Sequence, residues 1–139
     1  NAQLGCEYVS EMPESRFTKA EREYLSDPLR LGRLATVGAD GTPHVVPVGI
    51  FHEPNHDVIE VTGRELEKTK KYRDVERTGR AAIVVDDLAS VDPWLPRGIE
   101  VRGRAEAIRW PMPRIRIHPE RIVSWGLEGR RNARSVEEV

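Results

Sequence analysis

The feature that most constrains the fold is a turn between two strand-forming runs. In LRLGRLATVGADGTPHVVPVGIF, residues 29–51, β-branched and other apolar residues flank Asp40-Gly41. A tight hairpin turn needs residues that tolerate positive φ, and Asp-Gly supplies them. The stretch therefore predicts an antiparallel hairpin near the start of the chain.

The chain continues with short strands broken by turns. A second hairpin is expected to turn at EPNHD and to return through VIEVT. The run RAAIVVDD is continuously apolar before its two aspartates, which predicts a strand buried on both faces. GIEVRGRAEAI alternates, and a last strand is expected through RIRIHPERIVSW. The alternation predicts that one side of the fifth strand faces the core, with Ile99, Val101, Ala105 and Ala107.

Two helices are expected among these strands. In TKAEREYL, Thr18 and Glu21 have the spacing of a capping box, so a short helix is expected to begin at Thr18 and to end at Asp27-Pro28. ELEKTKKYRDVER, residues 65–77, has helix-forming composition. Six short strands with one helix in the middle predict a mainly β fold, a small closed β-barrel, rather than a doubly wound sheet.

Length and charge limit the organisation of the chain. Its 139 residues, 38% of them hydrophobic, suit one domain. We expect a flexible N-terminal arm at residues 1–16, a barrel at 17–127 and a charged C-terminal tail at 128–139, either solvated or wrapped around a partner. A net charge of −1 provides no overall field for nucleic acid or an anionic membrane. The chain contains no apolar run long enough to span a bilayer and no signal-peptide pattern at its start, which predicts a cytoplasmic protein.

Three of the four lysines gather in TGRELEKTKKYRDV, residues 62–75. Cations in the first turn of a helix are disfavoured by the positive end of the helix dipole. A bound anion would reverse that effect, because free backbone N–H groups, the ammonium groups of Lys70 and Lys71 and the hydroxyls of Thr62 and Thr69 could converge on one phosphate. The alternative is a charged surface that simply faces water.

Four stretches, in their order along the chain, resemble a known superfamily. RLATVGADGTPHVVPVGI is followed by VIEVTG, by TKKYRDVERTGRAAIVVDD and by PWLPRGIEVRGRAEAI. This order resembles the pyridoxamine 5'-phosphate oxidase-like split-barrel superfamily, and more closely its actinobacterial branch of flavin- or deazaflavin-dependent oxidoreductases. The resemblance covers residues 17 to about 127 and implies a six-stranded split β-barrel, the FMN-binding split barrel, with one or two short helices.

The resemblance also implies which residues hold the cofactor phosphate. In the superfamily a basic pair just after a strand has this role, and TKK lies in that place, so Thr69, Lys70 and Lys71 inherit it. Thr62 matches a hydroxyl that also faces the phosphate.

The cofactor ring is expected along the strand HVVPVG. This strand matches the one whose backbone lies along the tricyclic ring in the superfamily, which makes Val46, Pro47 and Val48 candidate ring neighbours. Such proteins are homodimers with the cofactor between the subunits, and Trp94 in DPWLPRG is expected to close the pocket from its loop.

The function implied is hydride transfer between coenzyme F-420, or alternatively FMN, and a small organic substrate. Two other interpretations stay open: an FMN-binding protein related to pyridoxamine phosphate oxidase, and a carrier or sensor that binds flavin, deazaflavin or haem without turnover. From Arg97 to Arg134 the chain has ten arginines against four glutamates, which either line a groove for the acidic tail of F-420 or pair with nearby carboxylates.

No side chain is identified as a catalytic acid or base. His44 lies on the expected ring-side strand, where a lone histidine is more often structural. HEPNH, residues 52–56, matches the H-E-x-x-H zinc pattern in letters only, because Pro54 prevents the helix that the pattern needs. The single cysteine, Cys6, excludes a multi-cysteine metal site, so no metal is expected.

Overall fold

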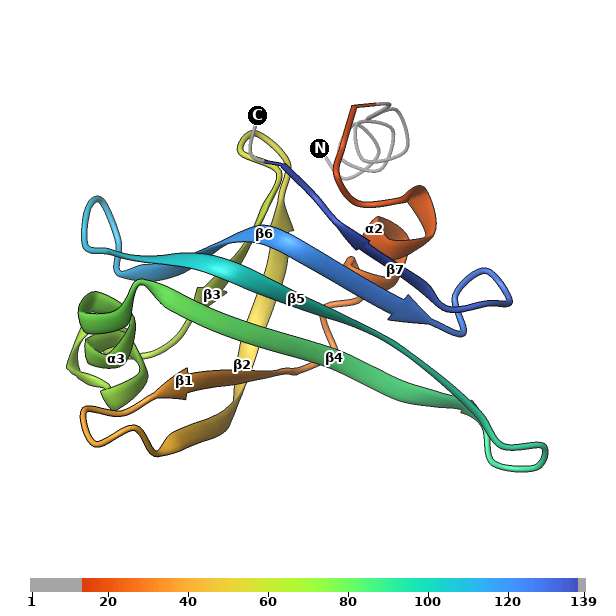
Figure 1. Ribbon diagram of the computed structural model, residues 1–139, viewed down its shortest axis with the longest axis horizontal. Coiled ribbons are helices and arrows are strands. Elements are labelled where there is room, and N and C mark those ends of the chain that lie inside the picture. Colours follow the sequence, from red (N-terminus) through yellow and green to blue (C-terminus); the bar gives the residue numbers. More distant parts are fainter. Residues whose placement is uncertain (1–13, 138–139) are drawn as a thin grey trace.

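The computed structural model describes residues 14–137, and Figure 1 shows strands curving into a barrel with helices at two of its sides. The predicted flexible arm, residues 1–16, lies almost wholly outside the described residues, as does Cys6. The elements in chain order are α2 (Lys19–Leu25), β1 (Gly32–Val37), β2 (Pro43–Glu53), β3 (Val58–Thr62), the 3-10 helix η1 (Leu66–Lys68), α3 (Lys70–Thr78), β4 (Arg80–Ser90), β5 (Leu95–Ile108), β6 (Arg114–Trp125) and β7 (Asn132–Ser135).

The barrel is closed by a pairing between strands that are far apart in sequence. The sheet runs β3-β2-β1-β4-β5-β6-β7, and β3 also pairs with the first part of β6 through Ile59 with Ile117 and Val61 with Ile115. β7 pairs with the second part of β6, residues 121–124. The predicted mainly β fold with a six-stranded barrel and two short helices is confirmed, while β7 is an additional strand that the sequence analysis did not predict.

Alternation places one face of β1, β4 and β5 in the core. In β5, Ile99, Val101 and Ala105 are buried as predicted. In β4 the prediction of burial on both faces was wrong for the single chain, since Ala82 and Val84 are only partly buried on the outer face. No helix layer lies over that outer face in Figure 1, unlike the arrangement that buries parallel strands on both sides.

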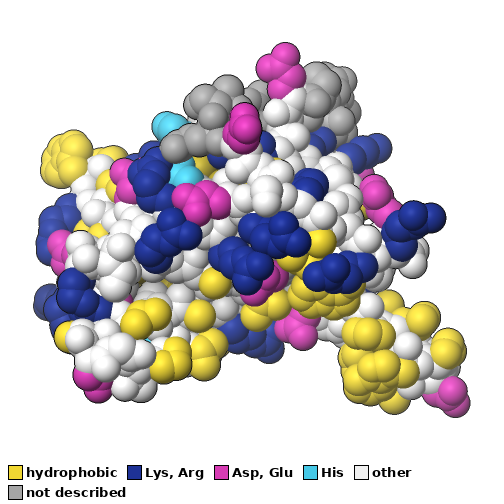
Figure 2. All heavy atoms as spheres, in the orientation of Figure 1, with side chains coloured by type: hydrophobic (Ala, Val, Ile, Leu, Met, Phe, Trp, Pro, Cys, Tyr) yellow, Lys and Arg dark blue, Asp and Glu magenta, His cyan; other side chains and the backbone are white. Residues whose placement is uncertain are grey.

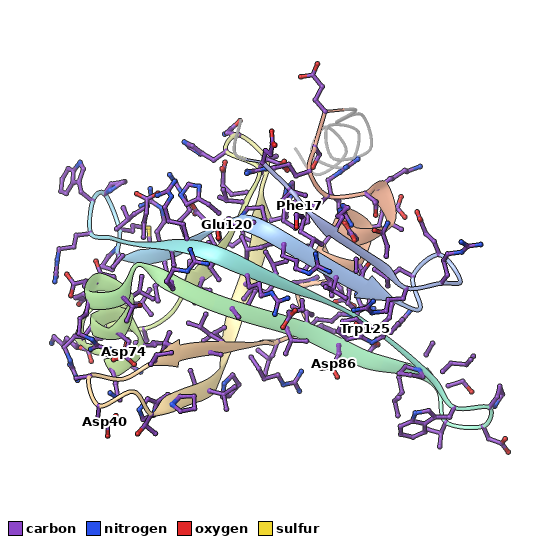
Figure 3. All side chains as sticks on the ribbon, viewed as in Figure 1. Phe17, Asp40, Asp74, Asp86, Glu120 and Trp125 are labelled. Atoms are coloured by element: carbon purple, nitrogen blue, oxygen red, sulfur yellow. The ribbon has the colours of Figure 1, made fainter. Side chains whose placement is uncertain are left out.

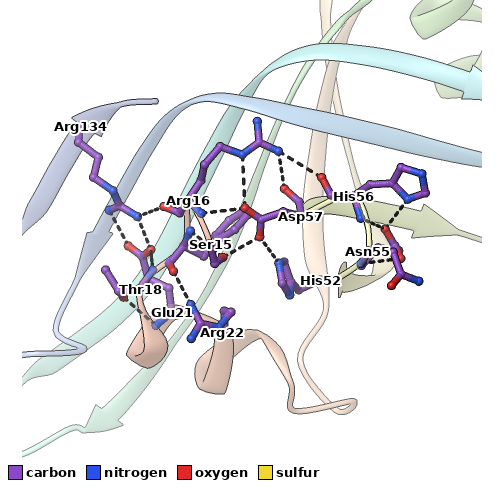
Figure 4. A network of polar contacts seen from close by, with 12 residues as sticks. Ser15, Arg16, Thr18, Glu21, Arg22, His52, Asn55, His56, Asp57 and Arg134 are labelled. Carbon is purple, nitrogen blue, oxygen red and sulfur yellow. Dashed lines mark hydrogen bonds and ion pairs between the residues drawn. The ribbon is translucent and has the colours of Figure 1, made fainter. Parts of the chain in front are cut away.

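The first helix is capped as predicted. The Thr18 hydroxyl accepts a hydrogen bond from the Glu21 backbone N–H at 3.1 Å, and the Glu21 carboxylate accepts one from the Thr18 N–H at 2.8 Å. α2 ends at Leu25, just before Asp27-Pro28. Glu21 is fully buried and also binds Arg134 of β7, with Oε1 2.6 Å from the guanidinium (Figure 4). Burial raises the Glu21 pKa, but the hydrogen bonds from Arg134, Ser124 and Thr18 outweigh it, and the net pKa is lowered.

The HEPNH stretch forms the turn of the second hairpin, as predicted. His52 is near the end of β2, and its Nε2 lies 2.7 Å from Asp57 Oδ1. His56 lies in the turn, and its Nδ1 is 2.8 Å from Glu53 Oε2 (Figure 4). Asp57 also accepts hydrogen bonds from the Ser15 hydroxyl and the Arg16 backbone N–H. Burial raises the Asp57 pKa, but these hydrogen bonds hold it well below its usual range. The two histidines therefore contact separate carboxylates, and it is Asp57, shared by His52, Ser15 and Arg16, that ties the N-terminal segment to the hairpin.

Residues 14–137 contain neither a membrane-spanning helix nor a cluster of metal-ligating side chains. No helix in this part of the chain is long and apolar enough to cross a membrane. Nor does this part bring together three histidine, cysteine, aspartate or glutamate side chains that could hold a metal ion.

Candidate cofactor site

β2 changes partners halfway along its length. Residues 43–48 pair with β1, and residues 49–53 pair with β3 on the opposite edge. Within the described chain, no strand pairs with the edge of residues 43–48 that faces away from β1. Backbone N–H and C=O groups on that edge lack sheet partners, and such groups readily bind an added chain or ligand. The open edge begins where Gly49 pairs with Thr62, the last residue of β3.

The two candidate lysines open the helix that follows β3. Thr69 has extended backbone angles and caps α3, since its hydroxyl accepts from the Tyr72 N–H at 3.4 Å. Lys70 and Lys71 are therefore the first two residues of the helix, as expected, and the first turn contains no acidic residue. The Thr69 hydroxyl proton is donated to the Leu66 carbonyl at 2.6 Å, so the visible role of Thr69 is to position the lysines.

The two lysines differ in what they contact. The Lys70 ammonium lies 3.4 Å from the carboxylate of Asp74, one turn further along α3. Asp74 is 1% exposed and also binds the Thr36 hydroxyl at 3.0 Å and Arg77 at 3.3 Å. Burial raises the Asp74 pKa, but these partners together lower it below its usual value. Lys71 forms no ion pair or hydrogen bond with another described residue, so its charge is available to a ligand.

The candidate ring neighbours divide between the faces of β2. Val48 is 6% exposed and packs in the core, Val46 is 36% exposed, and Pro47 is exposed on the opposite face. Thr62 is exposed at the end of β3, beside Gly49. A Cβ added to Gly49 would meet no atom within 4 Å, so the space over this junction is open. The backbone from Val46 to Gly49 and the Thr62 side chain thus border one open region.

Trp94 is not brought to this region within one chain. It lies in the β4–β5 hairpin tip, residues 91–94, and is 65% exposed. In Figure 1 this tip projects from the barrel at lower right, whereas α3 lies at the left. Figure 2, in the same orientation, shows an apolar knob at the position of the tip. Any contact between Trp94 and the lysines therefore requires a second copy of the chain.

The arginines are paired more than they are grouped. Arg97 binds Asp87 at 2.7 Å, Arg116 binds Glu60 at 2.9 Å, and Arg109 binds Glu76 at 3.1 Å. Figure 2 shows basic side chains interleaved with acidic ones across the visible face. Arg130 and Arg131 have no ion pair among the described residues and border a cavity of about 500 Å³ near the β6–β7 turn, away from the candidate residues. The structure thus favours pairing over a continuous arginine groove.

Two residues beside Lys70, Asp74 and Gly38, were not predicted from the sequence as part of the site. Asp74 was detectable as an acidic residue four positions after Lys70, the spacing of a helical ion pair. Gly38 gave no local signal, because its importance lies in its contacts: a Cβ on Gly38 would lie 3.1 Å from the Lys70 ammonium and 2.9 Å from His44 Nε2.

Comparisons with known proteins place this geometry in a family. The family model described as pyridoxamine 5'-phosphate oxidase matches residues 17–130. A 5a,11a-dehydrotetracycline/5a,11a-dehydrooxytetracycline reductase from Streptomyces rimosus is 43% identical over 122 residues, which cover 81% of this chain and 85% of the relative.

Solved structures share the fold at lower identity. An F420 reductase is 24% identical, with a TM-score of 0.55 over 72% of this chain and 94% of its own. A heme binding protein from Mycobacterium smegmatis is 17% identical, with a TM-score of 0.65 over 86% of this chain and 59% of its own.

The family match and the identity with a reductase show a split-barrel protein of the oxidoreductase class. The chain belongs to the pyridoxamine 5'-phosphate oxidase family. The residues present fit a flavin-type cofactor: the unpaired backbone edge suits a flat ring, the space over Gly49 is open, and Lys71 has no competing partner among the described residues.

Proposed function

We propose that this chain is a coenzyme F-420-dependent reductase, with FMN as the alternative cofactor, that transfers hydride between the cofactor and a small organic substrate. The observation that carries the proposal is the unpaired edge of β2, residues 43–48, at the end of the barrel that α3 and its lysines occupy. Its support from comparison is the identity of 43% with a reductase.

The substrate class we propose is a polycyclic compound with a reducible carbon–carbon double bond. The relative from Streptomyces rimosus is named for substrates that lack hydrogens at carbons 5a and 11a. The chain aligns with 85% of that relative, so the alignment includes most of the relative's length. A flat fused-ring substrate also suits an open, partly apolar strand such as the exposed part of β2.

The chain's own residues bind and orient. Lys70 and Lys71 supply positive charge for the cofactor phosphate, Thr69 caps the helix that presents them, and Thr62 adds a hydroxyl at the end of β3. The unpaired backbone edge from Val46 to Val48, where Pro47 offers a carbonyl but no N–H, orients the ring edge, and the Val46 side chain offers it an apolar contact. When bound, the cofactor supplies the hydride, and the protein supplies position and electrostatics.

The working unit we propose is a homodimer with the cofactor between the subunits. The outer faces of β1, β2 and β4 form an apolar surface with Ala35 beside Val45 on one strand and Ala82 on the other. Val45 is 67% exposed, and Val84 continues this surface. A second copy would cover it and explain why β4 is apolar on both faces. It would also bring the apolar tip with Trp94 toward a site that its own barrel cannot reach.

The test is a fluorescence titration of the purified protein with F-420 and, separately, with FMN. We expect tight F-420 binding and weak FMN binding, followed by oxidation of reduced F-420 when a dehydrotetracycline is added. A preference for FMN would reassign the cofactor. Binding without turnover on any such acceptor would point to a carrier or sensor, and binding of neither cofactor would refute the proposal.

A further inference from the structure

We propose that His44 is a direct ligand of the cofactor's phosphate, acting with Lys70, which lies beside it against Gly38. This inference rests on the proposed function, because it adds a residue to the anion site at Lys70. Thr62 pairs with Gly49, five residues further along β2, and is too far from His44 to bind the same oxygen. His44 lies in β2 on the same face as Val46 and Val48, at the end of the unpaired edge nearest α3.

The geometry brings two donors to one point. His44 Nε2 lies 2.9 Å and the Lys70 ammonium 3.1 Å from the position that a Cβ on Gly38 would occupy. His44 is partly exposed and forms no hydrogen bond or ion pair with another described residue. The two nitrogens therefore lie within about 6 Å of each other. Lys70 also contacts Asp74 at 3.4 Å, but an ammonium group has three N–H donors, so Lys70 and an imidazole N–H of His44 can share an anionic oxygen.

The surrounding charges leave room for an anion. Asp74 is the acidic group nearest to Lys70, and it is already shared with Arg77 and hydrogen-bonded to Thr36. Figure 3 places Asp74, on α3, and Asp40, in the β1–β2 turn, at the same end of the barrel. The Asp40 pKa is lowered first by its hydrogen bonds with Thr42 and also by the charge of Lys70. Lys71 adds a cation that has no partner among the described residues, so the cations at this end are not fully compensated.

Gly38 gives a test that removes no charged or hydrogen-bonding group. Its φ lies outside the left-handed region, so alanine is compatible with the backbone. The added methyl group would force the His44 ring or the Lys70 ammonium to move, because both contacts are shorter than ordinary carbon contacts. Gly38→Ala and His44→Ala should therefore weaken the same interaction by different means.

The experiment compares probes with and without the phosphate. FMN and riboflavin differ in the phosphate alone, and F-420 is compared with its ribityl deazaflavin, which lacks both the phosphate and the acidic tail. Binding of each probe is measured by fluorescence for the wild type, His44→Ala and Gly38→Ala. We expect each variant to bind the phosphate-bearing probe about tenfold more weakly, with less than a twofold change for its phosphate-free counterpart. His56→Ala, which removes a histidine that pairs with Glu53 in the β2–β3 turn, is the matched control and should change neither.

The outcomes separate the two proposals. Equal losses for phosphate-bearing and phosphate-free probes would mean that His44 contacts the ring or supports the fold, and the inference would be overturned while the cofactor assignment stands. Unchanged affinity in both variants would overturn it in the same way. Failure of the wild type to bind any of the four probes would overturn the proposed function and this inference together. Thermal unfolding of each variant establishes that the barrel is intact.

Discussion

The two halves of β2 show how one strand can serve both structure and function. Among residues 14–137, residues 43–48 pair with β1 alone and residues 49–53 with β3 alone, so each half has one edge without a strand partner in this part of the chain. The second half is packed by the N-terminal segment: Phe17 is 1% exposed, and its ring meets that of His52 edge-on at 5.0 Å. The first half lies at the end of the barrel with α3 and carries Val45, Val46 and Pro47 exposed.

The difference in packing between the two halves of β2 indicates which half can bind a ligand. The second half of β2, residues 49–53, packs against Phe17 of the core. Its hairpin turn is held to the N-terminal segment by the hydrogen bonds of Asp57. The half with exposed apolar side chains keeps its unpaired backbone groups at the surface, where they bind water and are available to a ligand or a second chain. We therefore expect substitutions where strands are paired and packed to lower the free energy of unfolding. Substitutions around the unpaired edge of residues 43–48 should instead lower the affinity for the cofactor.

The largest expected effect is that of Gly103→Ala, where β5 pairs with β6. A Cβ there would lie 2.2 Å from the His118 carbonyl oxygen and 2.9 Å from the Glu120 N–H, next to a register shift in the pairing. Both are backbone atoms that cannot move alone, so the free energy of unfolding should fall by about 2 to 3 kcal/mol. Urea unfolding measures this. Gly49→Ala, where the added methyl group meets nothing, is the control, and an equal loss there would contradict the comparison.

Val45→Asp should weaken the proposed dimer by about a hundredfold, because a symmetric interface would bury the new charge twice. Sedimentation equilibrium measures the dissociation constant. Leu29→Asp, which changes an 89% exposed leucine outside the apolar sheet face, should leave it unchanged. A wild-type protein that stays monomeric at high concentration would refute the dimer.

Replacing both Lys70 and Lys71 with alanine should weaken cofactor binding by about tenfold or more without unfolding the barrel. The phosphate would lose two cations, while Asp74 would keep Thr36 and Arg77 as partners. Fluorescence titration measures the affinity. Lys68→Ala, which removes a lysine that pairs with Glu65 at 3.1 Å, is the matched control. Unchanged affinity in the double variant would disprove the phosphate assignment.

The smallest expected effect is the pH dependence contributed by Asp87. Hydrogen bonds from Arg97 lower its pKa to about 2, against the opposing effect of burial and with help from Tyr24. A carboxyl whose pKa is lower in the folded state stabilises the fold above its ordinary pKa of 3.8, and this contribution is lost as the pH falls from there to about 2.

Asp87→Asn should therefore cost about 1 kcal/mol at pH 6, a value reduced for solvent screening of a side chain that is 35% exposed. The difference from the wild type, measured by urea unfolding, should shrink at pH 3. Asp92→Asn in the exposed hairpin tip is the control. Because Asp87 lies far from the open edge in chain order and pairing, cofactor affinity should not change.

Sequence analysis succeeded where the signal is local. The Asp40-Gly41 turn, the capping box of Thr18 and Glu21, and the start of a helix beside Lys70 each depend on residues within a few positions of one another. The alternation in β5 is equally local, because successive side chains of a strand point to opposite faces whatever lies beside it. Such local signals determine the helices and strands and their order without any information on contacts between distant residues.

Tertiary structure alone decided how the elements close and where they stay open. The β3–β6 pairing joins residues 59–61 to 115–117, β7 pairs with β6 and ties Arg134 to Glu21, and the partner change in β2 creates the unpaired edge. The contacts of Gly38 with His44 and Lys70 exist only because β2 and α3 pack beside it in the folded chain. The physical reason is that hydrophobic burial and strand pairing across long separations are not encoded in a short window, so the local pattern determines the strands while their packing determines the site.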